Sequence, residues 1–226
     1  MAQSRERPDT NEMVIVHRVY RRELRLLPPL VLGVAAGDRA RARELAEHCR
    51  FLTTALHHHH SDEDALLWPW LTGAAEVSAE VTERMQRQHD RAAALLTEVE
   101  QLAPRWAADA DPAVRHELAQ ALTALHAVLV EHLDDEEANL LPLVTEYITV
   151  AQWSELSRRG RRSMPMRQGF VFLGLMLQDA SPAERAGILA QMPAPVRFLF
   201  ARMGLPAYRR YVNRIHHTVP GWVLSS

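Results

Sequence analysis

Apolar residues recur at spacings of three and four along the first 150 residues of the chain, where glycine is scarce. This periodicity is typical of amphipathic helices, so we expect an all-α protein. Short connections make successive helices antiparallel neighbours, and we therefore expect an up-down-up-down four-helix bundle over residues 11–147. The predicted helices cover about 11–36, 38–71, 75–103 and 112–147.

Prolines mark several of the predicted helix ends. Pro28 and Pro29 should kink the first helix or end its regular part, because proline lacks an N–H and its ring crowds the preceding turn. Pro104 is expected to follow the end of the third helix. Asp111-Pro112 combines an N-cap residue with a proline suited to the first helical position, and so should open the fourth helix.

The chain changes in character near Thr149. Residues 151–226 carry eleven arginines against three acidic residues, although the whole chain has a net charge of −2. We interpret residues 148–226 as a helical C-terminal extension that packs on the bundle or on a partner chain, and the second arrangement would be a homodimer. Its predicted segments are a helix capped by Thr149, the apolar stretch 170–177, a helix opened by the capping box 181–184, and a helix over 195–214.

Composition excludes several classes of protein. The single cysteine, Cys49, rules out an internal disulfide framework and a cysteine-rich metal site. We find neither a secretory signal nor an apolar run near the ~20 residues that a membrane span requires, so we expect a cytoplasmic protein. The basic extension contains no nucleic-acid recognition motif, and we expect no nucleic-acid partner.

Two of the predicted helices bury a histidine and a glutamate in the middle of an apolar stripe. Steps of three and four along the second helix meet only apolar residues except His59 and Glu63. The same steps along the fourth helix meet only apolar residues except His132 and Glu136. The two stripes are Leu45, Cys49, Leu52, Leu56, His59, Glu63, Leu66 and Trp70, and Leu118, Leu122, Leu125, Leu129, His132, Glu136, Leu140 and Leu143.

These pairs predict a metal site inside the bundle. A buried carboxylate needs a partner or must become neutral. Residues four apart share a helical face, so two facing pairs would bring two imidazoles and two carboxylates around one volume, as bundle cores do for paired metals. The other two helices add His17 and His89 on their own stripes. This ligand set suits iron, manganese or zinc and not calcium or magnesium.

The second helix contains four consecutive histidines, His57 to His60. Successive helical residues turn by about 100°, so all four cannot face inward. His59 lies on the apolar stripe and four residues before Glu63, which favours it as the metal ligand of this helix. His60 lies three residues before Glu63 and is the best alternative, so the choice between the two stays open. Tyr20 lies three residues after His17, and Met85 lies four residues before His89, so both are candidate neighbours of the metal site. Packing in the core is the simpler role for both. We expect His48, His116 and His126 at the surface or helix flanks, His216 and His217 in structural roles, and Asp62, Asp64, Asp134, Asp135 and Glu137 outside the core.

The motifs resemble the hemerythrin-like family, also called the HHE cation-binding domain. The resemblance spans about residues 11–147 and rests on VHRVYRREL, HHHHSDEDALLWPWL, QRQHDRAAALL and VEHLDDEEANLLPLV. It implies a centre of two non-haem iron ions, with manganese or zinc as alternatives. By that likeness, Glu63 and Glu136 would bridge the ions, His17 and His59 would bind one, and His89 and His132 the other.

One departure from the family affects the expected function. The oxygen-carrying members have two histidines four apart on the third helix, whereas neither Met85 nor Ala93 can supply a second ligand beside His89. Fewer protein ligands favour chemistry with oxygen, peroxide or nitric oxide, as a scavenger or sensor, over simple oxygen carriage. The alternatives are an oxygenase or oxidase, which would need a pocket of a few hundred Å³ beside the metals, on the order of usual ligand sites, and a structural bundle with a metal staple.

Overall fold

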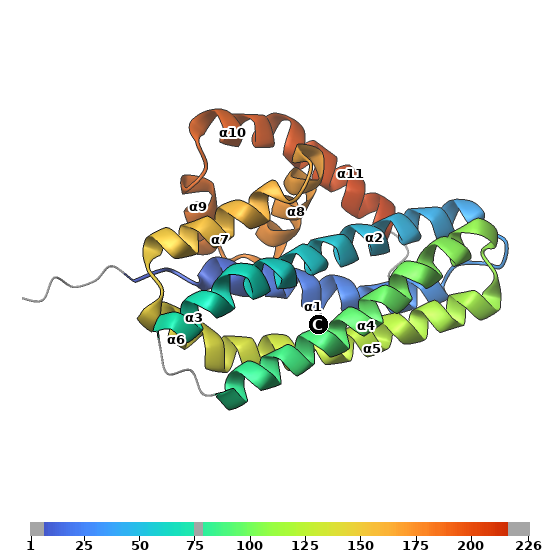
Figure 1. Cartoon of the computed structure of the whole chain (residues 1–226). Coiled ribbons are helices and arrows are strands. Elements are labelled where there is room, and N and C mark those ends of the chain that lie inside the picture. Colours follow the sequence, from blue (N-terminus) through green and yellow to red (C-terminus); the bar gives the residue numbers. More distant parts are fainter. Residues whose placement is uncertain (1–6, 75–78, 217–226) are drawn as a thin grey trace, which may run out of the picture.

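A computed structural model describes residues 7–74 and 79–216 of the chain. These residues form helices and connecting turns, without a strand among them, which confirms the all-α prediction (Figure 1). The bundle consists of α1 (Asn11–Leu32), α2 (Arg39–Asp62), η1 (Glu63–Leu67), α3 (Trp68–Ala74), α4 (Ala79–Asp109), α5 (Pro112–Asp135), η2 (Glu136–Leu140) and α6 (Leu141–Tyr147).

The four arms of the bundle alternate in direction, as predicted. The second arm is α2, η1 and α3 in one continuous run, and the fourth is α5, η2 and α6. The α4 helix packs against α2 and α5, and α5 packs against α1, so the arms surround a common interior (Figure 1). Side-chain caps set two helix starts, because Asp38 accepts from the backbone N–H of Arg41 and Asp111 accepts from those of Ala113 and Val114.

Three prolines that were expected to kink or limit helices lie inside them. The α1 helix passes through Pro28 and Pro29 and ends at Leu32, and α4 passes through Pro104 and ends at Asp109. Trp106, beyond Pro104, is fully buried. Burial of such a side chain offsets part of the ~3 kcal/mol that an interior proline costs. The predicted start of this third arm, Ala75, lies outside the described residues.

Short turns of π-helix interrupt both histidine-bearing arms at equivalent places. η1 begins at Glu63 and η2 at Glu136, and in each the backbone N–H five residues later bonds the glutamate carbonyl. Each turn begins six residues before a proline, Pro69 or Pro142. A proline displaces the carbonyl four residues earlier, and a widened turn relieves that clash. The repeated proline therefore places the same distortion next to each glutamate.

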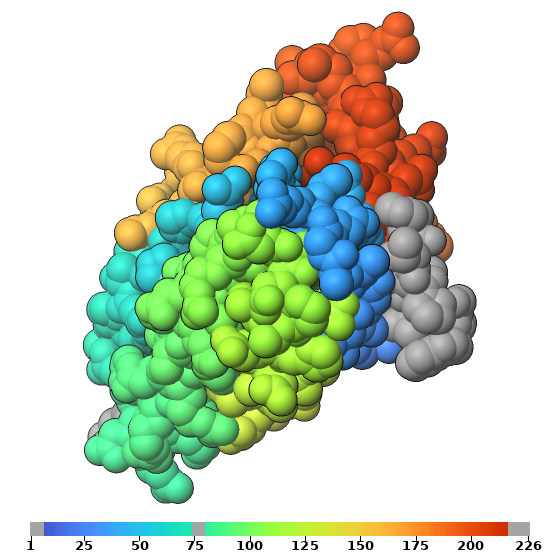
Figure 2. Space-filling view, turned by 90° about the vertical axis from the view of Figure 1, so that its right-hand side faces the viewer, coloured from blue at the N-terminus to red at the C-terminus, as the bar shows by residue number. Residues whose placement is uncertain are grey.

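The described part of the extension, up to His216, forms five α-helices that lie along one side of the bundle. They are α7 (Val150–Arg162), α8 (Met166–Asp179), α9 (Pro182–Ala190), α10 (Ala194–Leu199) and α11 (Leu205–His216), with η3 (Phe200–Gly204) joining the last two. The α8 helix packs on α1, and α7 and α11 pack on α2. Figure 2 shows these segments (orange to red) on the side away from α4 and α5 (green). Ser181 forms the predicted capping box, and Thr149, predicted as a cap, forms one as well. Within the described helices, none has the length and apolar content to cross a bilayer.

Two apolar clusters fill the interior. The larger one runs along the bundle and includes Leu27, Leu45, Leu52 and Leu125. The smaller one lies at the end formed by α3 and α6 and includes Met13, Leu67, Trp68, Met85, Leu140 and Val144. The buried histidines and glutamates belong to neither cluster. These buried histidines and glutamates therefore share the interior with the apolar side chains of the two clusters.

Candidate metal centre

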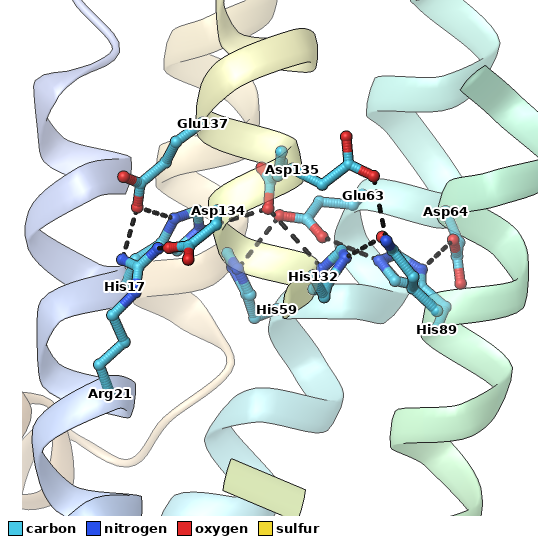
Figure 3. Close-up of polar contacts among 12 residues, drawn as sticks. His17, Arg21, His59, Glu63, Asp64, His89, His132, Asp134, Asp135 and Glu137 are labelled. Carbon is cyan, nitrogen blue, oxygen red and sulfur yellow. Dashed lines mark hydrogen bonds and ion pairs between the residues drawn. The ribbon is translucent and has the colours of Figure 1, made fainter. Parts of the chain in front are cut away.

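Each arm of the bundle contributes to one cluster of buried histidines and glutamates, which we call the central cluster. All six predicted ligands lie in it, and His60 joins them. The members are His17 on α1, His59 and His60 on α2, Glu63 at the start of η1, His89 on α4, His132 on α5, and Glu136 at the start of η2. Figure 3 shows several of these side chains pointing toward one another from the surrounding helices.

The cluster divides into two overlapping groups of ligand atoms. The first group holds His17, His59, Glu63 and Glu136, and one ligand atom from each lies within 4.8 Å of the others. His17 Nε2 is 3.4 Å from Glu136 Oε2, and His59 Nε2 is 3.2 Å from Glu63 Oε1. Such separations match neighbouring ligands of one ion, since metal–ligand bonds of this type are about 2.0–2.2 Å long.

The second group consists of His60, Glu63, His89 and His132, again with ligand atoms within 4.8 Å of one another. The ring of His60 stacks on His89 at 4.4 Å between centroids, and it stands edge-on to His132 at 5.1 Å. His60 does not replace His59, because the two neighbouring rings enter different groups. The sequence predicts four histidines here, and the cluster contains a fifth, His60, while α4 contributes His89 alone.

The two glutamates lie between the groups. Glu63 directs Oε1 toward His59, and its Oε2 is 3.6 Å from His89 Nε2. Glu136 Oε2 is near the rings of both groups, at 3.4 Å from His17 Nε2 and 3.8 Å from His132 Nε2. Glu63 thus has one carboxylate oxygen facing each group, which is the arrangement of a ligand that bridges two ions.

The inward-facing atoms lack hydrogen-bond partners. Nε2 of all five histidines makes no hydrogen bond among the described residues, and neither do Glu63 Oε1 or the two carboxylate oxygens of Glu136. Each unpartnered buried polar group costs about 1–3 kcal/mol, and so many in one volume need an explanation. Lone pairs that converge on a common point would be satisfied by metal ions, so this donor set fits the predicted centre.

The opposite nitrogens of three rings are held by polar side chains. His17 Nδ1 lies 2.8 Å from Glu137 Oε1, His89 Nδ1 lies 2.9 Å from Asp64 Oδ1, and His132 Nδ1 lies 3.2 Å from Gln88 Oε1 (Figure 3). An Nδ1–H that donates to an oxygen leaves the Nε2 lone pair free toward the centre. Glu137 and Asp64 directly follow the two buried glutamates in the sequence. Their position outside the core was predicted, but their contacts with the rings of His17 and His89 were not.

Burial and mutual proximity shift the titration of the cluster. Burial and the neighbouring Glu136 carboxylate raise the pKa of Glu63 well above its usual range, and burial also raises the pKa of Glu136. Burial and adjacent imidazoles lower the pKa of His59 and His60 well below the usual range, and that of His132 to about 3. These shifts favour the neutral rings of His59, His60 and His132, which is the form that binds metal, and a nearby cation would favour the ionised carboxylates.

The π-helical turns correct the predicted stripes beyond the glutamates. Leu66 and Trp70 are only partly buried, whereas Leu67 and Leu71 are fully buried. On the other arm, Val144 is fully buried and Leu143 is only partly so. One extra residue in a turn rotates the following positions, so the inward face moves by one residue.

Other predicted positions are also revised. His48 is buried and not at the surface, because the extension covers it and Tyr211 contacts its ring. Asp62 is also buried, since Arg159 of α7 binds it. Tyr20 is buried with its ring 5.6 Å from that of His59, and Met85 packs in the smaller apolar cluster. His217 lies outside the described residues.

Comparisons with known proteins agree with this geometry. The family model of the hemerythrin HHE cation binding domain matches residues 9–144, so the chain belongs to that family. Membership implies metal binding, for which the two groups of ligand atoms are suited. The zinc finger protein BRUTUS of Arabidopsis thaliana is 27% identical over 169 residues, which cover 74% of this chain and 13% of that relative. No solved structure matches the chain significantly.

Proposed function

We propose that the central cluster holds two metal ions, iron in the first instance, and that the protein binds or reacts with a small oxidant such as oxygen, peroxide or nitric oxide. The observation that carries this proposal is the convergence of five unpartnered histidine nitrogens on two glutamates. Manganese and zinc accept the same ligands. A pair of bound iron ions would supply redox chemistry and open positions for a small ligand.

The protein's own residues have distinct roles in this proposal. Glu63 and Glu136 would bridge the ions, because each carboxylate faces both groups. Glu137 and Asp64 would orient the rings of His17 and His89. The apolar side chains packed around the cluster would limit the entry of water and so favour a small uncharged ligand over a charged one.

A larger organic substrate receives less support. A cavity of about 540 Å³ lies between α2 and α4, and its size would suit a small molecule. None of the seven residues of the central cluster lines it. This cavity therefore gives no support to an organic substrate beside the metals, and the burial of the central cluster favours a small oxidant, as for a scavenger or sensor.

Metal analysis of the untagged protein, combined with its absorption spectrum, tests the proposal. We expect about two iron ions per chain and a near-ultraviolet absorption band that changes when peroxide is added. Glu63→Ala should remove most of the metal, whereas His58→Ala should leave the metal content unchanged. Equal loading of the two variants would contradict the ligand assignment. A protein that takes up no metal under anaerobic iron addition would favour a structural bundle.

A further inference from the structure

A second buried cluster of histidines and a glutamate lies where the extension meets the bundle. Glu23 is on α1, His48 on α2, and His216 is the last residue of α11, which packs on α2 (Figure 1). All three side chains are buried. One ligand atom from each lies within 4.8 Å of the others, and the cluster shares no residue with the central cluster.

The three side chains converge on one carboxylate oxygen. His48 Nε2 and His216 Nε2 both lie 3.0 Å from Glu23 Oε2. The approach is close, yet Glu23 Oε2 and His48 Nε2 make no hydrogen bond of acceptable geometry with any described residue. Two ring nitrogens thus converge on one buried carboxylate oxygen without a well-aligned N–H, which is an arrangement that ligands around an ion adopt.

Two of the remaining polar atoms, on Glu23 and His48, are held from outside the cluster, whereas His216 Nδ1 has no hydrogen-bond partner among the described residues. Glu23 Oε1 accepts a hydrogen bond of 2.7 Å from Arg22 Nε, and Arg22 also pairs with Asp179 of the extension. His48 Nδ1 lies 2.6 Å from the hydroxyl oxygen of Tyr211 on α11. An Nδ1–H that donates to this oxygen leaves the lone pair of His48 on Nε2, facing Glu23.

The charges of the cluster suit a cation. Burial alone would raise the pKa of Glu23, but the adjacent His216 and His48 rings and the Arg22 guanidinium outweigh it and hold that pKa well below its usual range. Burial lowers the pKa of His48 and so favours the neutral ring. A cation placed between the two rings would neutralise this buried carboxylate.

We propose that Glu23, His48 and His216 form an additional, mononuclear site for a divalent transition-metal ion such as zinc. Two imidazoles and one carboxylate are a common protein ligand set for zinc, with water in the fourth position, and ferrous iron accepts the same set. Because the ligands come from α1, α2 and α11, the ion would fasten the end of the extension to the bundle. This site is independent of the proposed function of the central cluster.

Zinc titration of chelator-treated protein tests the site. We expect the wild type to bind one zinc ion per chain more than His216→Ala and Glu23→Gln, with each variant first checked for helix content. His116→Ala is the matched control, because His116 is exposed on α5 and lies outside every cluster of candidate ligands. It should bind as much zinc as the wild type.

The difference of one ion does not depend on how many ions the central cluster takes. Loss of the central cluster in Glu63→Ala should leave the zinc ion at Glu23 in place, so failure of one proposal is distinguishable from failure of the other. Equal zinc binding by the wild type and His216→Ala would overturn the additional site. If both variants misfold, zinc-edge anomalous diffraction from wild-type crystals decides: a peak between the three side chains supports the site, and none overturns it.

Discussion

The carboxylate of Glu137 contacts Nδ1 of His17 at 2.8 Å while the same oxygen accepts a hydrogen bond of 2.6 Å from Arg21 Nη1. Glu137 is thus positioned by α1 and in turn positions a ring of the first group. We expect Glu137→Ala to weaken metal binding about 10- to 100-fold, because the ring loses the partner that fixes its tautomer and orientation. Competition with a chelator of known affinity would measure the change.

Glu131→Ala serves as the control for Glu137→Ala. Glu131 is on the same helical arm, but its exposed carboxylate contacts Arg91 and no ring of the central cluster. We expect its metal affinity to match that of the wild type. A similar loss of affinity in both variants would show that Glu137 acts through general charge and not through His17.

Asp64 has the equivalent position in the second group, 2.9 Å from His89 Nδ1. Asp64→Asn removes its charge and should weaken one of the two metal-binding steps, while Glu137→Ala weakens the other. The effect should be smaller than that of Glu137→Ala, since Asp64 is 43% exposed and water can replace it. Stepwise calorimetric titration would separate the two events, and loss of the same step in both variants would contradict the division into two groups.

Sequence periodicity was sufficient to predict the bundle and to bring His59, Glu63, His132 and Glu136 into one cluster, because these four residues interrupt otherwise apolar stripes. The prediction for His17 and His89 depended on the family resemblance as well as on their stripes. Periodicity was insufficient to predict the position of His60. A stripe with steps of three and four contains only one histidine of the run, whereas both His59 and His60 lie in the central cluster. The inward face beyond Glu63 was also missed, since the π-helical turn rotates it. The cluster of Glu23, His48 and His216 depends on how the extension packs, and helical periodicity contains no information about contacts between distant segments.

His60 provides a direct test of the five-histidine cluster. We expect His60→Ala to lose about one metal ion per chain, because its buried ring belongs to the second group alone. His57→Ala is the control, as His57 lies on the same helix with an exposed side chain. Metal content measured after gel filtration would compare the two variants. Full loading of His60→Ala would remove His60 from the ligand set and leave His59 as the only candidate histidine ligand of α2.

Two glycines of α8 test how closely the extension packs on itself. A methyl group at Gly174 would overlap the ring of Tyr208 on α11, whereas one at Gly169 would meet nothing within 4 Å. We expect Gly174→Ala to lower the free energy of unfolding by about 1–3 kcal/mol through overpacking. Gly169→Ala should instead raise it by about 0.5–1 kcal/mol, because alanine favours the helix. Urea unfolding would measure both, and equal values would contradict the close contact.

The contact between Asp62 and Arg159 joins the bundle to the extension beside the central cluster. Arg159 Nε lies 2.5 Å from Asp62 Oδ1, and the Asp62 side chain is only 10% exposed. Arg159→Ala should lower the free energy of unfolding by about 1–2 kcal/mol, because it leaves a nearly buried carboxylate without its cation. Arg158→Ala, whose partner Glu155 is exposed, should change it by less than about 0.5 kcal/mol.

A double-mutant cycle isolates the interaction of Asp62 with Arg159 from other effects of each substitution. Asp62→Ala with Arg159→Ala should be less destabilised than the sum of the single variants, since no charge is then left unpartnered. The measurement is best made on metal-free protein, because Asp62 is adjacent to Glu63 and its charge contributes to the raised pKa of that carboxyl. Additive single effects would mean that Arg159 stabilises the extension through packing of its alkyl chain and not through the ion pair.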